Sequence, residues 1–127
     1  MSYKLEVQPG EPIIWETWGI DFDPETDAIA SVQEEIELLD AAQVSMVVVV
    51  DTRAVNLTFD DIIFLASNGV PDEMNHHPRL GGMILITTSE VIAKSVEGLN
   101  SKNFSYIKMD VVASRDEALG QARKYLS

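Results

Sequence analysis

The chain has 127 residues and a hydrophobic content of 46%, which is typical of one globular domain with a core of its own. It contains no cysteine, which excludes disulfides and thiolate chemistry, and its formal net charge is −12. Twelve acidic groups but a single basic group, Lys4, lie in residues 1–51, and such a surface repels nucleic-acid phosphates and anionic lipids. We therefore expect one domain over residues 1–127 without a nucleic-acid partner, although acidity that only maintains solubility is the simpler interpretation of the charge.

The location of the protein is predicted from what the sequence lacks. The first residues show neither the basic start nor the apolar run of a signal peptide. The longest purely apolar run, Met46 to Val50, is too short to span a bilayer. These features favour a cytoplasmic protein without membrane insertion.

The chain begins with a pattern typical of a β-hairpin. Tyr3 to Val7 alternates as a strand does, Gln8 to Pro12 is a turn signal, and Ile13 to Phe22 reads as a second strand. We expect these two strands to pair antiparallel.

A helix is predicted to follow at Asp23-Pro24, where the aspartate caps backbone N–H groups and proline suits the first turn. Apolar residues at spacings of three and four define one face: Ile29, Val32, Ile36 and Leu39. Polar residues define the opposite, solvated face: Gln33, Glu34, Glu37 and Asp40.

The remaining elements alternate between buried strands and capped helices. The strands are predicted at residues 46–50, 83–87 and 106–112, the first two of them apolar without alternation and so covered on both faces. Helices are predicted to begin after Thr58, which forms a capping box with Asp61, after Ser89 and after Ser114. The first of these is expected to end near Asn68, with Gly69 at its end, and the last near Leu126. In the helix after Ser89, one face is expected to hold Ile92, Val96 and Leu99.

The resulting order, β-β-α-β-α-β-α-β-α, predicts an α/β fold. Strands that alternate with helices imply right-handed crossovers and a mostly parallel, open sheet, to which the N-terminal hairpin adds one antiparallel strand. Helices on both faces of the sheet are the usual arrangement, and a one-sided arrangement stays open.

Asp51 and Arg53 form the first candidate site. They directly follow a central strand, at the end where open α/β sheets tend to bind ligands. The carboxylate of Asp51 is suited to hold a substrate or a metal. Alternatively, Asp51 caps nearby backbone N–H groups or pairs with Arg53, and this structural interpretation is favoured because no second acidic strand end is evident.

His76, His77 and Arg79 form the second candidate site. They lie in the longest segment that is predicted to be irregular, Gly69 to Gly82. Adjacent histidines in extended chain point in opposite directions, which disfavours a metal site. A loop that docks on a partner or covers a pocket is the better functional hypothesis, beside that of an ordinary surface loop.

The sequence contains no motif of a cofactor or of nucleophilic catalysis. Gly81-Gly82 precedes a strand rather than following one, and no Walker or dinucleotide fingerprint is present. No metal, cofactor or catalytic residue is therefore predicted. Trp15 and Trp18 are expected on opposite faces of the second strand, and one of them is a candidate for an exposed interface aromatic.

From about Ile13 onward the chain resembles the SpoIIAA-like branch of the STAS fold, the domain of sulphate transporters and anti-sigma-factor antagonists. The matching stretches are the helix from Asp23, the strand Val47 to Asp51, the helix opening at Thr58, the strand Met83 to Thr87 and the segment Val111 to Leu119. The resemblance implies a regulatory or protein-interaction module, and it also suggests relatives that bind lipids.

The resemblance breaks at the regulatory position. Anti-sigma-factor antagonists carry a phosphorylatable serine at the start of the helix after the central strand, whereas the region here reads Asn56 to Ile62 and contains no serine. Thr58 is the nearest hydroxyl and is expected to cap the helix, while Asp60 or Asp61 is suited to stand in for a permanent negative charge.

Three functions are thus open. The first is a non-enzymatic interaction module that binds a protein partner or a second copy of itself, for which a homodimer is the common form. The second is a binding domain for a small apolar molecule or lipid, with the segment 69–82 over an apolar pocket. The third, ranked last, is an enzyme that uses Asp51, His76 and His77.

Overall fold

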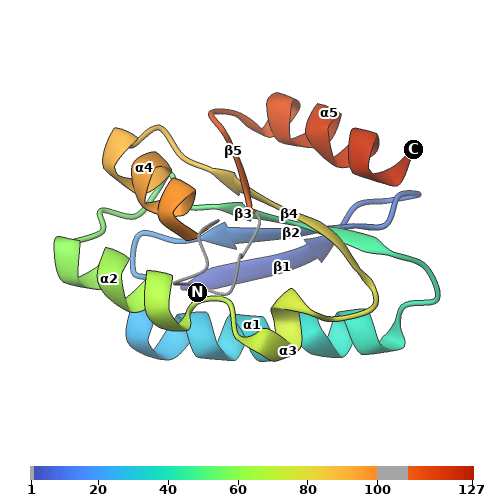
Figure 1. The fold of residues 1–127 in the computed structure, drawn as a ribbon, viewed down its shortest axis with the longest axis horizontal. Coiled ribbons are helices and arrows are strands. Elements are labelled where there is room, and N and C mark those ends of the chain that lie inside the picture. The colour runs from blue at the N-terminus through green and yellow to red at the C-terminus, as the bar shows by residue number, and fades with distance from the viewer. Residues whose placement is uncertain (1, 100–108) are drawn as a thin grey trace.

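The computed structural model describes residues 2–99 and 109–127, which form a five-stranded sheet covered by helices (Figure 1). The elements in chain order are β1 (Tyr3–Val7), β2 (Ile13–Trp18), α1 (Pro24–Ala41), β3 (Met46–Asp51), α2 (Phe59–Asn68), α3 (Asp72–Asn75), β4 (Leu80–Ile86), α4 (Glu90–Leu99), β5 (Asp110–Val112) and α5 (Arg115–Leu126). The predicted α/β class and the predicted order are confirmed, with the short helix α3 as an addition.

The strands lie in the sheet in the same order as in the sequence, β1-β2-β3-β4-β5. β1 pairs antiparallel with β2 and all other pairs are parallel, as the hairpin and the alternating pattern predict. From β2 to β5, each connection leads to the next parallel strand on the same side of the preceding one. Because right-handed crossovers that progress in one direction along a sheet pass over the same face, the connecting helices must all lie on one face. Helices α1 to α4 accordingly share one face and α5 covers the other (Figure 1).

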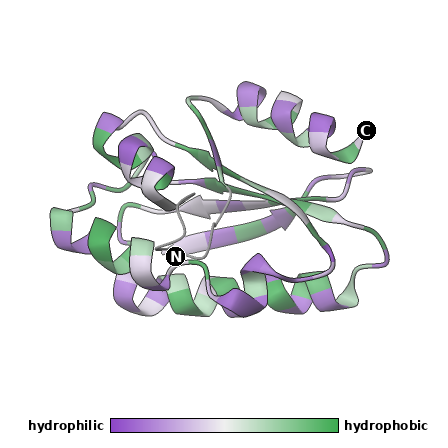
Figure 2. Ribbon diagram, in the orientation of Figure 1, coloured by the Kyte–Doolittle hydropathy of each residue, from purple (hydrophilic) through white to green (hydrophobic). Residues whose placement is uncertain are grey.

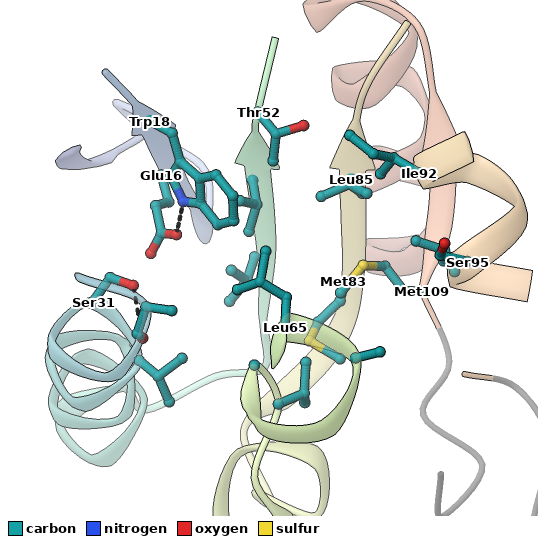
Figure 3. Close-up of a pocket in the computed structure, with 18 of the residues that line it drawn as sticks. Glu16, Trp18, Ser31, Thr52, Leu65, Met83, Leu85, Ile92, Ser95 and Met109 are labelled. Atoms are coloured by element: carbon teal, nitrogen blue, oxygen red, sulfur yellow. Dashed lines mark hydrogen bonds between the residues drawn. The ribbon is translucent and has the colours of Figure 1, made fainter. Parts of the chain in front are cut away.

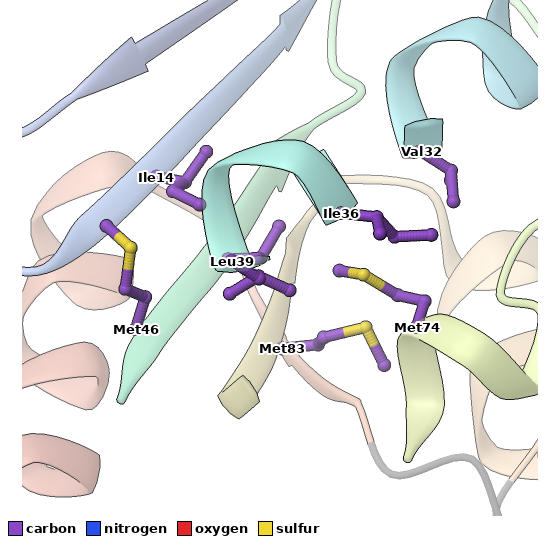
Figure 4. Packing of buried hydrophobic residues seen from close by; sticks show 8 residues of the cluster. Ile14, Val32, Ile36, Leu39, Met46, Met74 and Met83 are labelled. Atoms are coloured by element: carbon purple, nitrogen blue, oxygen red, sulfur yellow. The ribbon is translucent and has the colours of Figure 1, made fainter. Parts of the chain in front are cut away.

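Two hydrophobic clusters fill the two sides of the sheet. Between the sheet and helices α1 and α3 the buried residues are Ile14, Val32, Ile36, Leu39, Met46, Val48, Met74 and Met83 (Figure 4). Under α5 they are Ile13, Trp15, Val47, Val49, Ile84, Ile86, Ala118 and Ala122. Consecutive residues of β3 and β4 therefore point into opposite clusters, which explains their unbroken apolar runs. Figure 2 shows the matching pattern on α1 and α5, where hydrophobic and hydrophilic residues alternate.

The predicted helix starts are confirmed by their hydrogen bonds. Asp23 accepts the backbone N–H of Glu25, with Pro24 in the first turn. Thr58 and Asp61 form the reciprocal capping box, with N···O distances of 3.1 and 2.9 Å. Helices α4 and α5 begin at hydroxyl caps of the same kind, Ser89 to the N–H of Ile92 and Ser114 to the N–H of Glu117.

Several predicted details are wrong. The second strand ends at Trp18 rather than at Phe22, because the chain turns at Gly19 to reach the cap of α1. Ile29 is 53% exposed, since the apolar face of α1 begins with Ala28 instead. The segment 69–82 is not irregular throughout: it contains α3, and β4 begins at Leu80.

Gly81 and Gly82 therefore lie inside a strand rather than in a loop. Gly82 is required by close packing, because a Cβ there would lie 2.9 Å from the ring of Tyr125 on α5. The last predicted strand is confirmed for Asp110–Val112, while residues 106–108 and the side chain of Leu99 lie outside the described part of the chain.

Candidate functional site

An apolar pocket lies between the sheet and helices α1, α2 and α4, and we call it the sheet pocket. Its floor consists of side chains from three neighbouring strands and its cover comes from the helices (Figure 3). The residues that define it best are Val48, Val50, Leu65, Met83, Leu85 and Ile92. The empty space amounts to about 840 Å³ with its open mouth included, and the cavity volume is about 110 Å³. The cavity volume is the space that a ligand can fill without movement of the protein, and it corresponds to a small molecule.

Two glutamates interrupt this apolar lining. Glu16 lies on β2 between Ile14 and Trp18, and Glu35 lies on the buried face of α1. They are 2% and 3% exposed. The indole N–H of Trp18 donates to Oε2 of Glu16, whereas Oε1 of Glu16 and Oε2 of Glu35 have no hydrogen-bond partner. No other residue thus donates to these two buried acceptors, and an ionised pair would leave them unsatisfied, which is costly in an apolar surrounding.

The pair is expected to keep a proton that a solvated glutamate would lose. Burial is the largest effect and raises the pKa of both carboxyls. Repulsion by Glu16 and the hydrogen bond between the two side chains raise the pKa of Glu35 further, and the charge of Glu34 acts in the same direction. Two carboxyls in contact share protons as one unit, so we describe Glu16 and Glu35 together as the glutamate pair.

Asp51 and Arg53 are engaged with each other, as the structural interpretation of this site predicts. Nε and Nη2 of Arg53 donate to the two carboxylate oxygens of Asp51 at 2.9 and 2.8 Å. Burial alone would raise the pKa of Asp51, but the side-chain and backbone hydrogen bonds from Arg53 outweigh it and lower the pKa. The strand order never reverses between β2 and β5, so the crevice that binds ligands at a topological switch point is missing as well.

The two histidines diverge. His76 is exposed, whereas His77 packs against the C-terminal part of α1, where its Nε2 lies 2.7 Å from Oδ1 of Asp40. Nδ1 of His77 accepts the backbone N–H of Arg79 at 3.0 Å, so Nε2 carries the proton and donates to Asp40. Arg79 itself is exposed. His77 therefore holds the segment before β4 against α1.

The three residues of the enzyme hypothesis do not converge. His77 lies just before Leu80, which pairs with Met46 at the start of β3, whereas Asp51 ends β3. Five residues of strand separate these ends by roughly 16 Å. In the described part of the chain, no group of three or more His, Asp or Glu side chains is arranged to hold a metal ion.

Thr58 serves as the cap of α2, as predicted. Trp15 and Trp18 do lie on opposite faces of β2, but both are buried, so the expectation of an exposed aromatic is wrong. Trp15 lies under the guanidinium of Arg115, 4.2 Å from the ring centroid, and Trp18 stacks on Phe22 with centroids 3.8 Å apart. The segment 69–82 contributes Gly69, Val70 and Met74 to the sheet pocket, and the histidines take no part in it.

The glutamate pair is absent from the sequence-based candidates, although its signals are visible. Glu16 occupies the middle of an alternation, with Ile14 and Trp18 two residues to each side. Glu35 lies three residues after Val32 and four before Leu39, on the apolar face of α1 rather than on the solvated one. A charged residue that has the same spacing as the apolar residues of a buried face is expected to be buried with them.

Comparisons with known proteins assign this chain to no family, because no family model, no curated protein and no solved structure matches it. None of the described helices is both long and apolar enough to cross a bilayer.

Proposed function

We propose that this chain is a binding domain for a small, mostly apolar molecule that occupies the sheet pocket. The observation that carries the proposal is an apolar pocket with two buried carboxyls as its polar groups, since ligand sites are typically apolar hollows with few polar anchors. From the sequence, the segment 69–82 is expected to lie over an apolar pocket. Two of its residues, Val70 and Met74, line the sheet pocket and support this expectation.

Helix α2 is the wall best suited to move. Ile62, Leu65 and Ala66 of α2 line the pocket, yet none of the residues of this helix is buried. Phe59 at its start is 71% exposed. An element with so little buried surface opens at a low free-energy cost, so ligands larger than the cavity volume are admitted when α2 shifts.

The test combines detection of a bound molecule with a matched pair of variants. Native mass spectrometry of protein purified without denaturant is expected to show extra mass that denaturation removes. In NMR titrations with 1-hexanol, the signals of Met83 and Leu85 are expected to shift with a Kd on the order of 1 mM, because burial contributes about 0.8 kcal/mol per CH₂ before association costs.

The matched variants place the same bulk inside or outside the pocket. Ala66→Phe fills the pocket and should abolish these shifts, whereas Ser67→Phe, at the exposed neighbouring position, should leave them unchanged. Equal binding by both variants would contradict the assignment of the pocket.

The interaction module predicted from the family resemblance is the second candidate. The observation in its favour is exposed apolar surface on the elements that cover the pocket, at Phe59 and Ile63 of α2 and Val91 of α4. A ligand that shifts α2 would change this surface, so the two functions are compatible. Sedimentation velocity with and without 1-hexanol tests self-association: a monomer under both conditions contradicts the homodimer expectation.

A further inference from the structure

We propose that the sheet pocket selects molecules whose polar end is a hydrogen-bond donor with positive charge, an alkylammonium group, which binds the free oxygens of Glu16 and Glu35. The inference rests on the proposed function and specifies the class of ligand.

The first argument is that the donors in the pocket are already used. The described lining residues with a side-chain N–H or O–H each donate within the protein: Trp18 to Glu16, Ser31 to the carbonyl of Ala28 at 3.1 Å, Thr52 to the carbonyl of Ile86 at 3.0 Å and Ser95 to the carbonyl of Val91 at 2.8 Å. The hydroxyl of Ser31 also lies close enough to Glu16 to lower its pKa, but its one proton serves a protein acceptor in either geometry. Among these four residues, no donor is left for a ligand carboxylate, phosphate or carbonyl, and a proton on the glutamate pair is held between its two carboxyls.

The second argument is that acceptors remain. No other residue donates to Oε1 of Glu16 or to Oε2 of Glu35, so a proton held between the two carboxyls is the one donor available to them, and a ligand ammonium can take its place. Both side chains are more than nine-tenths buried where they line the pocket. Figure 3 shows the carboxyl of Glu16 between β2 and the start of α1, with Ser31 beside it. An ammonium group carries three N–H donors and no acceptor, which complements this set of atoms.

The third argument is electrostatic. None of the ion pairs in the described structure involves Glu16 or Glu35, so no cationic side chain compensates a negative charge on the glutamate pair. The outside charge that acts on both carboxyls belongs to another acid, Glu34 on α1, which accepts the hydroxyl of Tyr3 on β1 at 2.5 Å. The pocket residues that α2 and α4 contribute carry no charge. A ligand cation therefore meets only attraction, and a ligand carboxylate only repulsion.

The cavity volume sets the size of a suitable probe. About 110 Å³ is somewhat less than the roughly 150 Å³ of an engineered cavity that binds benzene. Six-carbon chains are therefore suitable, and three of them differ only in the polar end: hexylamine, which is protonated at neutral pH, 1-hexanol and hexanoate. The amine brings charge and donors, the alcohol one donor, and the carboxylate acceptors only.

The experiment measures the affinity of each probe for the full chain near neutral pH, with the NMR signal of the Trp18 indole N–H as reporter. This group donates to Glu16 and is buried, so binding of amines to the acidic outer surface leaves it unmoved. We expect hexylamine to bind about tenfold more tightly than 1-hexanol, and hexanoate to show no binding.

The outcomes separate the two proposals. If none of the three probes shifts the indole signal or the signals of Met83 and Leu85, the proposed function fails. If 1-hexanol or hexanoate binds as tightly as hexylamine, the pocket stands and the selectivity for ammonium is refuted.

The double variant Glu16→Gln/Glu35→Gln supplies the residue-level test, because it removes both carboxyls while keeping their shape. It should abolish the preference for hexylamine and retain binding of 1-hexanol, whereas Glu37→Gln, at an exposed position of the same helix, should keep the preference. A preference that survives in the double variant overturns the assignment. Should the double variant not fold, Glu35→Gln replaces it; one carboxyl then remains, so the preference should weaken, and an unchanged preference overturns the assignment.

Discussion

The free energy of unfolding of Glu35→Gln is expected to exceed that of the wild-type protein increasingly as the pH rises. In the folded wild type, burial raises the pKa of Glu35, so ionisation of the pair is opposed in the core and unopposed in the unfolded chain. Glutamine has the same shape, carries no charge, and can donate its amide N–H to the partnerless oxygen of Glu16.

The sign and size follow from proton linkage. A carboxyl whose pKa is raised by folding contributes stability that is fully present below the unfolded pKa of about 4.3 and is lost as the pH rises through the folded pKa. Between these two values, the stability of the wild type relative to the variant falls by about 1.4 kcal/mol per pH unit. The relative exposure of Glu35 is only 3%, so solvent hardly screens the charge of its carboxylate. The slope is therefore expected at nearly its full size.

Urea unfolding followed by tryptophan fluorescence provides the assay, since both Trp15 and Trp18 are buried. Wild type and variant are compared at several values between about pH 5 and about pH 8, and only their difference is interpreted, because other carboxyls titrate in both proteins. Glu37→Gln, exposed on the same helix, should show a difference that is independent of pH. A difference for Glu35→Gln that is equally flat would refute the buried, proton-sharing pair.

Three further substitutions test other parts of the structure. Thr58→Ala removes the capping box of α2 and should lower the free energy of unfolding by about 1 kcal/mol, with faster amide exchange confined to that helix, whereas Thr58→Ser should preserve it. Leu39→Ala should cost about 2–5 kcal/mol in urea unfolding because the side chain is fully buried, while Ile29→Ala, on the exposed side of α1, should change stability by less than about 0.5 kcal/mol. Arg115→Met should cost about 0.5–1 kcal/mol and alter the fluorescence of Trp15, over whose ring the guanidinium lies.

The sequence predicts the class and order of the fold because local signals and burial agree there. The run Val47 to Val50 has no polar alternation, and the structure buries β3 between two clusters. Asp23, Thr58 and Ser114 precede apolar periodic stretches, and each accepts a backbone N–H at a helix start. These elements depend on hydrogen bonds and periodicities within a few residues, which a single sequence displays.

Features that depend on distant packing could not be predicted in this way. Gly81 and Gly82 look like a loop signal, but they belong to β4, where the absence of a side chain at Gly82 makes room for Tyr125. Trp15 is covered by a partner that is remote in sequence, Arg115. Trp18 lies in a cluster with its near neighbour Phe22 that also includes side chains as distant as Leu65. The sheet pocket combines residues from three strands and four helices, so neither its volume nor its lining follows from any local pattern.

The glutamate pair places two ionisable side chains at buried positions, where apolar residues are expected. Two apolar side chains at these positions would complete the core, and replacing buried charges by well-packed apolar groups often leaves stability unchanged or increases it. Oε1 of Glu16 and Oε2 of Glu35 instead remain without donors, at a cost that rises with pH. In our proposal this cost is offset when a ligand ammonium supplies the missing donors, so the feature that weakens the empty protein is the feature that selects its ligand. Binding of hexylamine should accordingly stabilise the wild type more than the double variant Glu16→Gln/Glu35→Gln, by a margin that grows toward higher pH while the amine stays protonated.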